Sequence, residues 1–372
     1  MASVKQQNIL FPISYTEILE RIRTIDPIKY TTTRNYTNGA VSYLSPYISR
    51  GVISTKLILS EILQSGYPPI QIEKFIQELA WREYWQQVWI AKGDSINEDM
   101  KQKQTPVLNK GIPTAILNAN TGIEAIDKAI VNFYATGYIH NHVRMYIAAL
   151  TCNIAQSHWK LPAQWMYYHL LDADWASNAL SWQWVAGTNA NKKYVANQDN
   201  INKYCFTDQK NTYLDVSYTH LPLSTIPSKL QDISSLSLKT ILPKQKGITI
   251  NKNLPTCIYN FYNLDPNWKK EIKANRVLLL EPSHFEKYPI AQKTLDFILV
   301  ISKENITDIQ IYIGEFDAFT TKHPSTNVYF KEHPLQTHYK GTEVPRDWMF
   351  TVDGYYPSFF SFWKKCKKQL DY

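Results

Sequence analysis

The stretch "LLDADWASNALSWQW", Leu170–Trp184, combines two carboxylates, an amide and three tryptophans. If it is wound as a helix from Asp174, then Asp174, Asn178 and Trp182 fall at i, i+4 and i+8 and share one face. A core-facing stripe does not select Asp and Asn, and Asn has a low helix propensity. This face is therefore interpreted as a binding face for a ligand with polar edges and a flat aromatic body.

Composition limits the classes of protein that the chain can belong to. Its 372 residues suit two domains, and a formal net charge of +8 favours polyanionic partners such as nucleic acid. The widely spaced Cys152, Cys205, Cys257 and Cys366 contain no C-x-x-C pair, which argues against a disulfide framework or a zinc ribbon. Because the sequence shows neither a signal-peptide core nor an apolar run of bilayer length, a soluble, cytoplasmic protein without a membrane partner is expected.

Periodicity changes along the chain. Residues 12–204 carry helical periodicity, so the fold class is expected to be mainly α. Residues 205–253 are rich in Pro, Ser, Thr and Lys and are interpreted as a linker or an irregular wrap on the first domain. In residues 254–372, the order strand, helix, strand from Arg276 to Phe316 predicts a right-handed, parallel βαβ unit whose helix has Pro289 in its first turn. The expected architecture is an all-helical domain followed by a smaller α/β domain.

The segment "QELAWREYW" mixes charge and indole on one predicted helix face. Glu78, Trp81, Arg82 and Trp85 fall at i, i+3, i+4 and i+7. One interpretation is an amphipathic helix with a Glu–Arg ion pair. The other is a pocket wall on which Trp81 stacks a base while Glu78 accepts hydrogen bonds from it.

The segment "TGYIHNHVRM" contains two histidines and an arginine. His140 and His142, at i and i+2, point nearly apart on a helix, so no metal site is expected. Arg144 lies in a largely apolar helix, where a guanidinium needs a counter-charge, and Asp172 or Asp174 is the expected partner.

These clusters, in this order, resemble the photolyase/cryptochrome family from about Pro12 to Tyr204, the extent of that family's helical FAD-binding domain. The resemblance implies an FAD-dependent, light-driven enzyme, a deoxyribodipyrimidine photo-lyase that splits cyclobutane pyrimidine dimers in damaged DNA by electron transfer from reduced flavin. The alternatives are a cryptochrome-like blue-light photoreceptor that binds FAD without repair, and a nucleic-acid-binding protein without flavin. The antenna chromophore and any protein partners are left unknown.

The resemblance also assigns residues. The positions matched to FAD contacts are Tyr30, Ser42, Leu44, Ser45, Phe75, Glu78, Arg82, Asn141, Arg144, Asp172, Asp174 and Asn178. The positions matched to the lesion pocket are Glu78, Trp81, Arg82, Met145 and Trp184. The expected catalytic set is Trp182, Trp159, Asn178 and Glu78.

Two features depart from the family pattern. Trp182 and Trp159 match the first two members of its electron-transfer chain, but the third has no counterpart upstream of Thr121-Gly122. The electron-transfer chain is therefore either truncated or rerouted through Trp165 or a tyrosine. Trp175 is assigned to packing. The usual antenna domain is not found ahead of the helical domain, and an α/β segment follows it instead. That segment is a displaced antenna domain, a partner-binding module or a structural cap.

Overall fold

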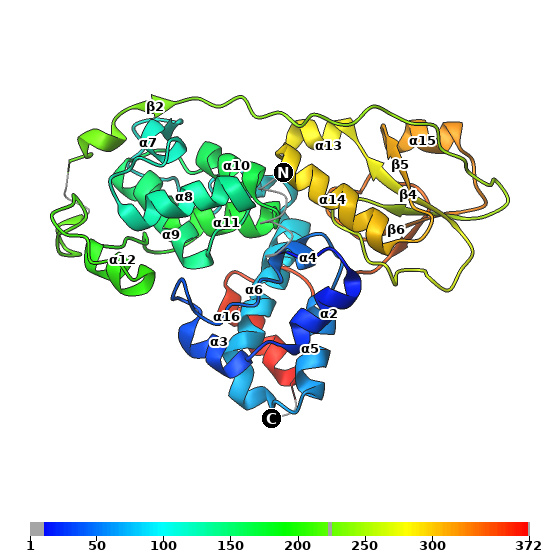
Figure 1. The fold of residues 1–372 in the computed structure, drawn as a ribbon, viewed down its shortest axis with the longest axis horizontal. Coiled ribbons are helices and arrows are strands. Elements are labelled where there is room, and N and C mark those ends of the chain that lie inside the picture. Colours follow the sequence, from blue (N-terminus) through cyan, green and yellow to red (C-terminus); the bar gives the residue numbers. More distant parts are fainter. Residues whose placement is uncertain (1–10, 222–224, 371–372) are drawn as a thin grey trace. The chain divides into compact units, whose positions relative to one another are not determined.

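The computed structural model describes residues 11–221 and 225–370. Contacts divide the chain into two compact units, which are treated separately (Figure 1). The described part of unit 1 comprises residues 26–41, 91–221 and 225–238, and that of unit 2 comprises residues 11–25, 42–90 and 239–370. This grouping is different from the ranges 12–204, 205–253 and 254–372, which stay a prediction about folding domains.

Unit 1 is mostly helical, as expected for this part of the chain. Its elements are α3 (Pro27–Thr33), a 3₁₀ helix (Gly93–Asn97), β1 (Ile112–Pro113), α7 (Thr114–Leu117), α8 (Glu124–Thr136), α9 (Asn141–Ala149), a π-helical segment (Leu150–Ile154), α10 (Lys160–His169), α11 (Trp175–Ala186), α12 (Gln198–Cys205), a 3₁₀ turn (Ser228–Leu230) and β2 (Ile233–Ser234). Helix α11 packs against both α9 and α10 (Figure 1). Strand β2 pairs antiparallel with β1, so part of the proline-rich segment lies along unit 1.

The chain geometry around α8 and α9 follows from a few residues. Helix α8 ends where Gly137 takes a left-handed conformation, with φ of 73°. The apolar helix that carries Arg144 is α9, which passes directly into the π-helical segment. Asn153 of that segment donates hydrogen bonds to the carbonyl oxygens of Val185 and Tyr194, at 2.9 and 2.7 Å.

Unit 2 combines helices from the first quarter of the chain with a parallel sheet from the last third. Its elements are α2 (Tyr15–Arg23), α4 (Ser45–Ser49), α5 (Thr55–Gln64), α6 (Pro69–Lys92), β3 (Thr256–Tyr259), β4 (Asn275–Leu280), α13 (Pro282–Lys287), α14 (Gln292–Asn305), β5 (Gln310–Ile313), α15 (Phe316–Lys322), β6 (Val328–Lys331), β7 (Thr342–Val344), α16 (Phe359–Cys366) and a 3₁₀ turn (Lys367–Gln369). The sheet makes this unit α/β.

The sheet has the order β5-β4-β3-β6-β7, and all neighbouring strands are parallel. The chain therefore starts at the centre and adds strands first on one side and then on the other. Ile258 lies between Val277 and Phe330 in the register, and all three belong to the apolar core. The predicted parallel pairing of the strands around Arg276 and Phe316 is confirmed by β4 and β5.

The prediction that Pro289 lies in the first turn of a helix is wrong. The predicted helix begins later, because α14 starts at Gln292 and Pro289 lies in the turn between α14 and a short helix, α13, that was not predicted. Proline disfavours the helical conformation of the residue before it. Tyr288 accordingly has φ of −129° and ψ of 72°, which ends α13, and Ala291 is extended before the new helix starts.

One close approach joins the early helices of unit 2 to its sheet. Gly51, which follows α4 with φ of 61°, lies so near the segment after β3 that an added Cβ would be 2.3 Å from the carbonyl oxygen of Tyr262. The fully buried Arg50 places its guanidinium 3.5 Å from the ring centroid of Phe261, and its carbonyl oxygen accepts from the Leu264 N–H at 2.9 Å. Only glycine fits at position 51, because a Cβ there would collide with the Tyr262 carbonyl oxygen.

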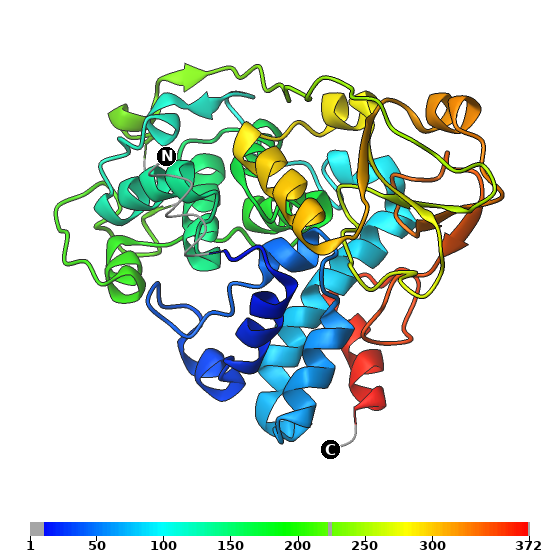
Figure 2. The same ribbon diagram turned by 45° about the vertical axis from the view of Figure 1, so that its right-hand side comes forward.

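The end of the chain lies along α6. We call residues 346–370 the C-terminal strap; Figure 2 shows its helix α16 beside α6. Arg346 donates to Gln86 at 2.7 Å, and the Tyr84 hydroxyl donates to the Tyr356 carbonyl oxygen at 3.1 Å. Glu73 accepts from Lys367 at 2.8 Å. The strap is thus held at several levels of α6.

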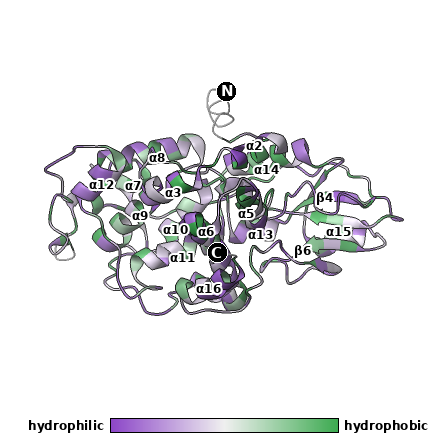
Figure 3. Cartoon of the chain, turned by 90° about the horizontal axis from the view of Figure 1, so that it is seen from below, coloured by the Kyte–Doolittle hydropathy of each residue, from purple (hydrophilic) through white to green (hydrophobic). Residues whose placement is uncertain are grey.

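Helix α16 is amphipathic, with hydrophobic and hydrophilic residues on different sides (Figure 3). Phe359, Phe362 and Trp363 are buried, whereas Lys364 and Lys365 are exposed. Within the described ranges, the model contains no helix with the length and apolarity needed to cross a membrane.

Glu83 of α6 is a buried carboxyl group that ties the strap to α5. It is 4% exposed and accepts hydrogen bonds from the Thr55 hydroxyl at 2.5 Å and the Met349 N–H at 2.6 Å. Burial, the largest influence, raises its pKa from 4.5 to about 7. The folded protein therefore holds this proton over a pH range in which the unfolded chain has released it.

Glu83→Gln is expected to flatten the pH dependence of stability. A carboxyl group whose pKa is raised on folding lowers stability as pH rises from about 4.5 to about 7, on the order of 3 kcal/mol in total. Urea unfolding at pH 5 and pH 8 measures the difference. The control Glu20→Gln, at a side chain that is 65% exposed, should behave as the wild type does. Equal pH dependence in all three proteins contradicts the prediction.

Candidate functional site

The turn before α11 is fixed by backbone contacts in unit 1. The Leu171 N–H donates to the carbonyl oxygen of Gly137 at 2.9 Å, and a Cβ at Gly137 would lie 2.8 Å from the Leu171 side chain. Asp174 is the N-cap of α11 and accepts from the Ser177 N–H at 2.8 Å. The segment between α10 and α11 is therefore held against the start of α9.

Arg144 and Asp172 meet across this turn. The Arg144 Nη2 donates to both carboxylate oxygens of Asp172, at 3.1 and 2.9 Å, and its Nε donates to the Ile139 carbonyl oxygen at 2.9 Å. The side chains are 20% and 5% exposed, respectively. The predicted counter-charge for Arg144 is confirmed, and of the two candidates it is Asp172. The guanidinium is therefore fixed in position by at least these two contacts.

Asn178 is held in a defined orientation on α11. Its Nδ2 donates to the Ala163 carbonyl oxygen of α10 at 2.8 Å. An amide nitrogen cannot accept, so this bond decides which end of the amide faces α10. The Oδ1 atom at the other end is left as a hydrogen-bond acceptor.

The tryptophans of unit 1 differ in their surroundings. Trp159, Trp165, Trp175 and Trp182 are at most 3% exposed, whereas Trp184 is 38% exposed and lies 5.9 Å from the ring of Tyr194. The Trp159 Nε1 donates to Asp99 at 2.7 Å, and that of Trp175 donates to Asn97 at 2.7 Å. The Trp165 Nε1 donates to the Tyr134 hydroxyl at 3.0 Å.

The other predicted residues of unit 1 lie on α3 and α9. Tyr30 is half-buried on α3, a helix that Asp26 caps by accepting from two backbone N–H groups. Asn141 is exposed as the first residue of α9, and Met145 is half-buried one turn further on.

The two histidines beside α9 have structural partners. His140 caps α9 by accepting from the His142 N–H, and burial lowers its pKa to about 4. His142 contacts the Asn35 carbonyl oxygen at 3.0 Å and the Tyr194 hydroxyl at 3.3 Å. A neutral His140 suits its acceptor role.

Predicted residues of unit 2 occupy α4 and its approach. The Leu44 N–H lies 3.4 Å from the Ser42 hydroxyl, which it uses as an acceptor, and Ser45 is the first residue of α4. Tyr43 between them has a positive φ of 53°.

Helix α6 carries the remaining predicted residues. Phe75 is buried, Glu78 pairs with Lys74 at 3.0 Å, and Arg82 donates to the Ser49 hydroxyl at 2.8 Å. The Glu78 and Arg82 side chains thus contact different neighbours on the helix and on α4.

Trp81 stacks on the C-terminal strap. Its ring centroid is 3.9 Å from that of Phe359, with an angle of 9° between the planes. Trp85 lies at 5.1 Å and Tyr84 meets the indole edge-on at 5.8 Å. One face of the predicted base-stacking residue is therefore covered within unit 2.

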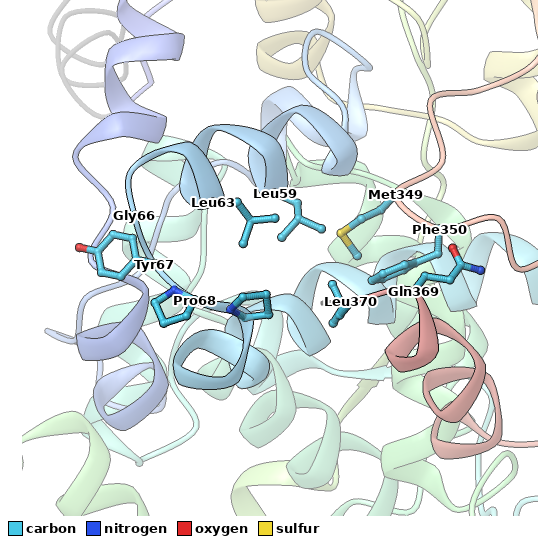
Figure 4. Close-up of a pocket in the computed structure, with 10 residues that line it drawn as sticks. Leu59, Leu63, Gly66, Tyr67, Pro68, Met349, Phe350, Gln369 and Leu370 are labelled. Atoms are coloured by element: carbon cyan, nitrogen blue, oxygen red, sulfur yellow. The ribbon is translucent and has the colours of Figure 1, made fainter. Parts of the chain in front are cut away.

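A pocket of about 490 Å³ lies elsewhere in unit 2 (Figure 4). Leu59 and Leu63 of α5 line it together with Met349, Phe350 and Leu370 of the strap. None of its lining residues was predicted from the sequence as a site residue. Its lining residues include no carboxylate, guanidinium or indole, the groups that the predicted chemistry uses.

Comparison with known proteins identifies the family. The model described as the FAD binding domain of DNA photolyase matches residues 75–262, just over half of the chain. The chain therefore belongs to the photolyase/cryptochrome family, whose cofactor is FAD. The matched range includes Arg144, Asp172 and Asn178, and it excludes the predicted phosphate contacts around α4.

Curated relatives match only in part. The chain is 28% identical over 167 residues to the deoxyribodipyrimidine photo-lyase of Alkalihalophilus pseudofirmus. The aligned region covers 43% of this chain and 35% of the relative. The chain is 30% identical over 169 residues to the mitochondrial enzyme of Saccharomyces cerevisiae, covering 40% and 29%. The chain thus spans about a third of the length of these relatives.

Two solved structures match this chain at low similarity. A Synechocystis cryptochrome is 24% identical with a TM-score of 0.47, covering 51% of this chain and 43% of that one. A class III photolyase from Agrobacterium tumefaciens is 23% identical with a TM-score of 0.41, covering 51% and 44%.

Two contacts of the tryptophans were not predicted from the sequence: that of Asp99 with Trp159 and that of Phe359 with Trp81. Asp99 stands 60 residues before Trp159, in an acidic "NED" run typical of a solvated turn, and Phe359 stands far from Trp81 in the chain. Helical spacing detects neighbours within one element only. The aromatic run "FFSFW" was the one available signal for α16.

Asp172→Ala is expected to destabilise unit 1 by about 1–3 kcal/mol, because it leaves the largely buried Arg144 without its carboxylate. Asp172→Asn keeps an acceptor and should lose less. Urea unfolding of both variants measures the loss of stability. Glu124→Ala, which breaks the exposed pair with Lys128, is the control and should cost less than about 0.5 kcal/mol. Similar losses of stability in all three variants would show that the Arg144–Asp172 pair stabilises the protein no more than a surface ion pair does.

Proposed function

We propose that the protein is an FAD-dependent, light-driven DNA photolyase that splits cyclobutane pyrimidine dimers by electron transfer from reduced flavin. The observation that carries the proposal is the family match over residues 75–262 together with the ordered set Arg144, Asp172 and Asn178 inside that range. Damaged DNA is the proposed partner, and the net charge of +8 suits a polyanion. The relatives named as photo-lyases support the same reaction.

The polar groups near the start of α11 suit the polar edge of a flavin. When bound, the flavin supplies light absorption and the electron that the reaction needs. Arg144 is held by Asp172 and by its own loop, so its guanidinium is positioned before any ligand arrives. Asn178 offers Oδ1 as an acceptor because its Nδ2 is engaged with Ala163. A hydrogen-bond acceptor at Oδ1 of Asn178 favours the protonated form of the flavin ring, which can donate a hydrogen bond to it.

Buried indoles suit the supply of electrons. Trp182 and Trp159 are 3% and 0% exposed, so each can be oxidised without contact with bulk water. Trp182 shares helix α11 with Asn178, one turn away. We propose that these two residues deliver electrons toward the flavin, with Trp182 as the nearer donor.

Glu78, Trp81 and Arg82 are the proposed lesion-binding residues of α6. The stack of Phe359 on Trp81 leaves only part of the indole available to a base. It also holds the indole rigid, which lowers the entropic cost of stacking. A photoreceptor without repair is the alternative that this covered face favours.

Purified protein is expected to carry noncovalent FAD, seen in its absorbance spectrum. Asn178→Leu removes the acceptor but keeps the side chain's size, so FAD should still bind while the reduced flavin loses a hydrogen bond. A loss of about 1 kcal/mol corresponds to roughly 20 mV in a two-electron potential. Spectroelectrochemical titration measures the change, which should be negative. Protein that remains colourless after incubation with FAD contradicts the proposed function.

Repair is tested with dimer-containing oligonucleotides, single- and double-stranded, illuminated with fully reduced protein. Trp81→Ala should weaken damage-specific binding by about tenfold or more, because base–indole stacking contributes roughly 1–3 kcal/mol. Glu78→Ala should lower the yield of dimer splitting more than it lowers binding to the damaged oligonucleotide. Phe359→Leu is the matched control, since it removes the intramolecular stack but keeps Trp81.

The control separates recognition from packing. If Phe359→Leu weakens damage-specific binding as much as Trp81→Ala does, Trp81 contributes by packing within unit 2 and not by stacking on a base of the DNA. If the wild type binds FAD yet restores no thymines on either substrate, the photoreceptor function replaces repair.

A further inference from the structure

Three buried tryptophans of unit 1 donate their indole N–H to different kinds of acceptor. Trp165 uses the hydroxyl of Tyr134 and Trp175 uses the amide oxygen of Asn97, both neutral. Trp159 uses the carboxylate of Asp99, at 2.7 Å. All three indoles are at most 1% exposed, so burial does not distinguish them. The acceptor does, and the basic one belongs to a proposed electron donor.

Asp99 is built into its position. Its Oδ1 accepts from Trp159 and lies 3.3 Å from the Nε2 of His158. Its Oδ2 accepts from the Gln104 N–H at 2.9 Å, and Gln104 in turn accepts from the Trp159 N–H of the backbone at 3.0 Å. The Asp99 and His158 side chains are 19% and 21% exposed, so this cluster links a fully buried indole to solvent.

We propose that Asp99 is the proton acceptor for Trp159 when that indole gives up an electron, an inference that rests on the proposed function. Trp159 loses one electron toward the light-excited oxidised flavin, by way of Trp182. Its Nε1–H bond breaks, the proton moves to Oδ1 of Asp99, and an O–H bond forms. The products on this chain are a neutral indole radical and a carboxylic acid, so charge and atoms balance.

This transfer makes the charge separation last. An indole radical cation readily takes its electron back, whereas the neutral radical must recover a proton in the same process. His158, at 3.3 Å from the same oxygen, offers the proton a route to solvent. Trp159 can therefore serve as the final donor, which removes the need for a third aromatic residue.

Anchoring alone does not explain the carboxylate. The segment that ends at Asp99 is already tied to the helices of unit 1 by Asn97, whose bond to the Trp175 indole is equally short, and by the Ile96 carbonyl oxygen, which accepts from Gln183 at 2.9 Å. A neutral amide is sufficient for such a bond. Asp99 also faces His158, but among the acceptors of these three indoles it is the one whose oxygen can take the N–H proton.

The first test compares FAD-loaded wild type, Asp99→Asn and Asn97→Ala after a laser flash. Asp99→Asn keeps an oxygen that accepts the indole N–H but cannot take its proton. Transient absorption distinguishes the neutral indole radical from its cation. We expect the neutral radical in wild type and in Asn97→Ala, and the cation in Asp99→Asn, with a lifetime shortened tenfold or more. Thermal unfolding checks that all three proteins are folded.

The second test needs no flavin. A ruthenium polypyridyl photo-oxidant with persulfate as electron acceptor oxidises tryptophans in flavin-free protein, and Trp159→Phe supplies the blank. Electron paramagnetic resonance then reports the protonation state of the Trp159 radical, which should be neutral in wild type and cationic in Asp99→Asn.

The outcomes separate the two proposals. If the Trp159 radical has the same protonation state and lifetime in wild type and Asp99→Asn, Asp99 is an anchor and the inference is overturned. If wild type binds no FAD or shows no light-driven reduction, the proposed function fails, and the flavin-free test still decides whether Asp99 accepts the proton.

Discussion

The ion pair between Arg144 and Asp172 is the contact on which the organisation of unit 1 depends. A guanidinium on a mostly apolar helix is stable only beside a counter-charge, so the segment before α11 must pass next to α9. The Leu171–Gly137 hydrogen bond holds that segment at the same level. Asp174 can then cap α11 in one direction only, and this direction places Asn178 against Ala163. The positions of the polar residues that we propose for flavin binding thus follow from one buried pair.

Unit 2 is organised around α6, and here the constraint is shared between carboxylates and aromatic rings. Glu83 and Glu73 accept from opposite ends of the C-terminal strap, and the stack of Trp81 on Phe359 lies between them. Helix α6 thus serves stability and also carries the proposed lesion-binding residues. Substitutions on it change both properties together, which is why binding has to be compared with a variant of the strap.

Periodicity predicted that residues 12–204 are mainly helical, because a helix buries a stripe that repeats along its own sequence. It also predicted the strands around Arg276 and Phe316, and the charge of Arg144 in an apolar helix predicted a counter-charge at Asp172 or Asp174. It did not predict where α14 begins, because Pro289 lies in the turn after α13 and not in the helix. Contacts between distant segments, such as Trp159 with Asp99, leave no periodic signal in one sequence, so the surroundings of each indole had to come from the structure.

Burial describes Trp159 and Trp175 almost identically, yet the two indoles differ in the acceptor of their N–H. Asn97 is the last residue of one 3₁₀ helix and Asp99 follows two residues later, so a small change in that segment decides which indole is next to a base. An electron donor needs a place for the charge it leaves behind, and a packing residue does not. The acceptor of the N–H is therefore a better guide to the role of a buried tryptophan than the depth at which it lies.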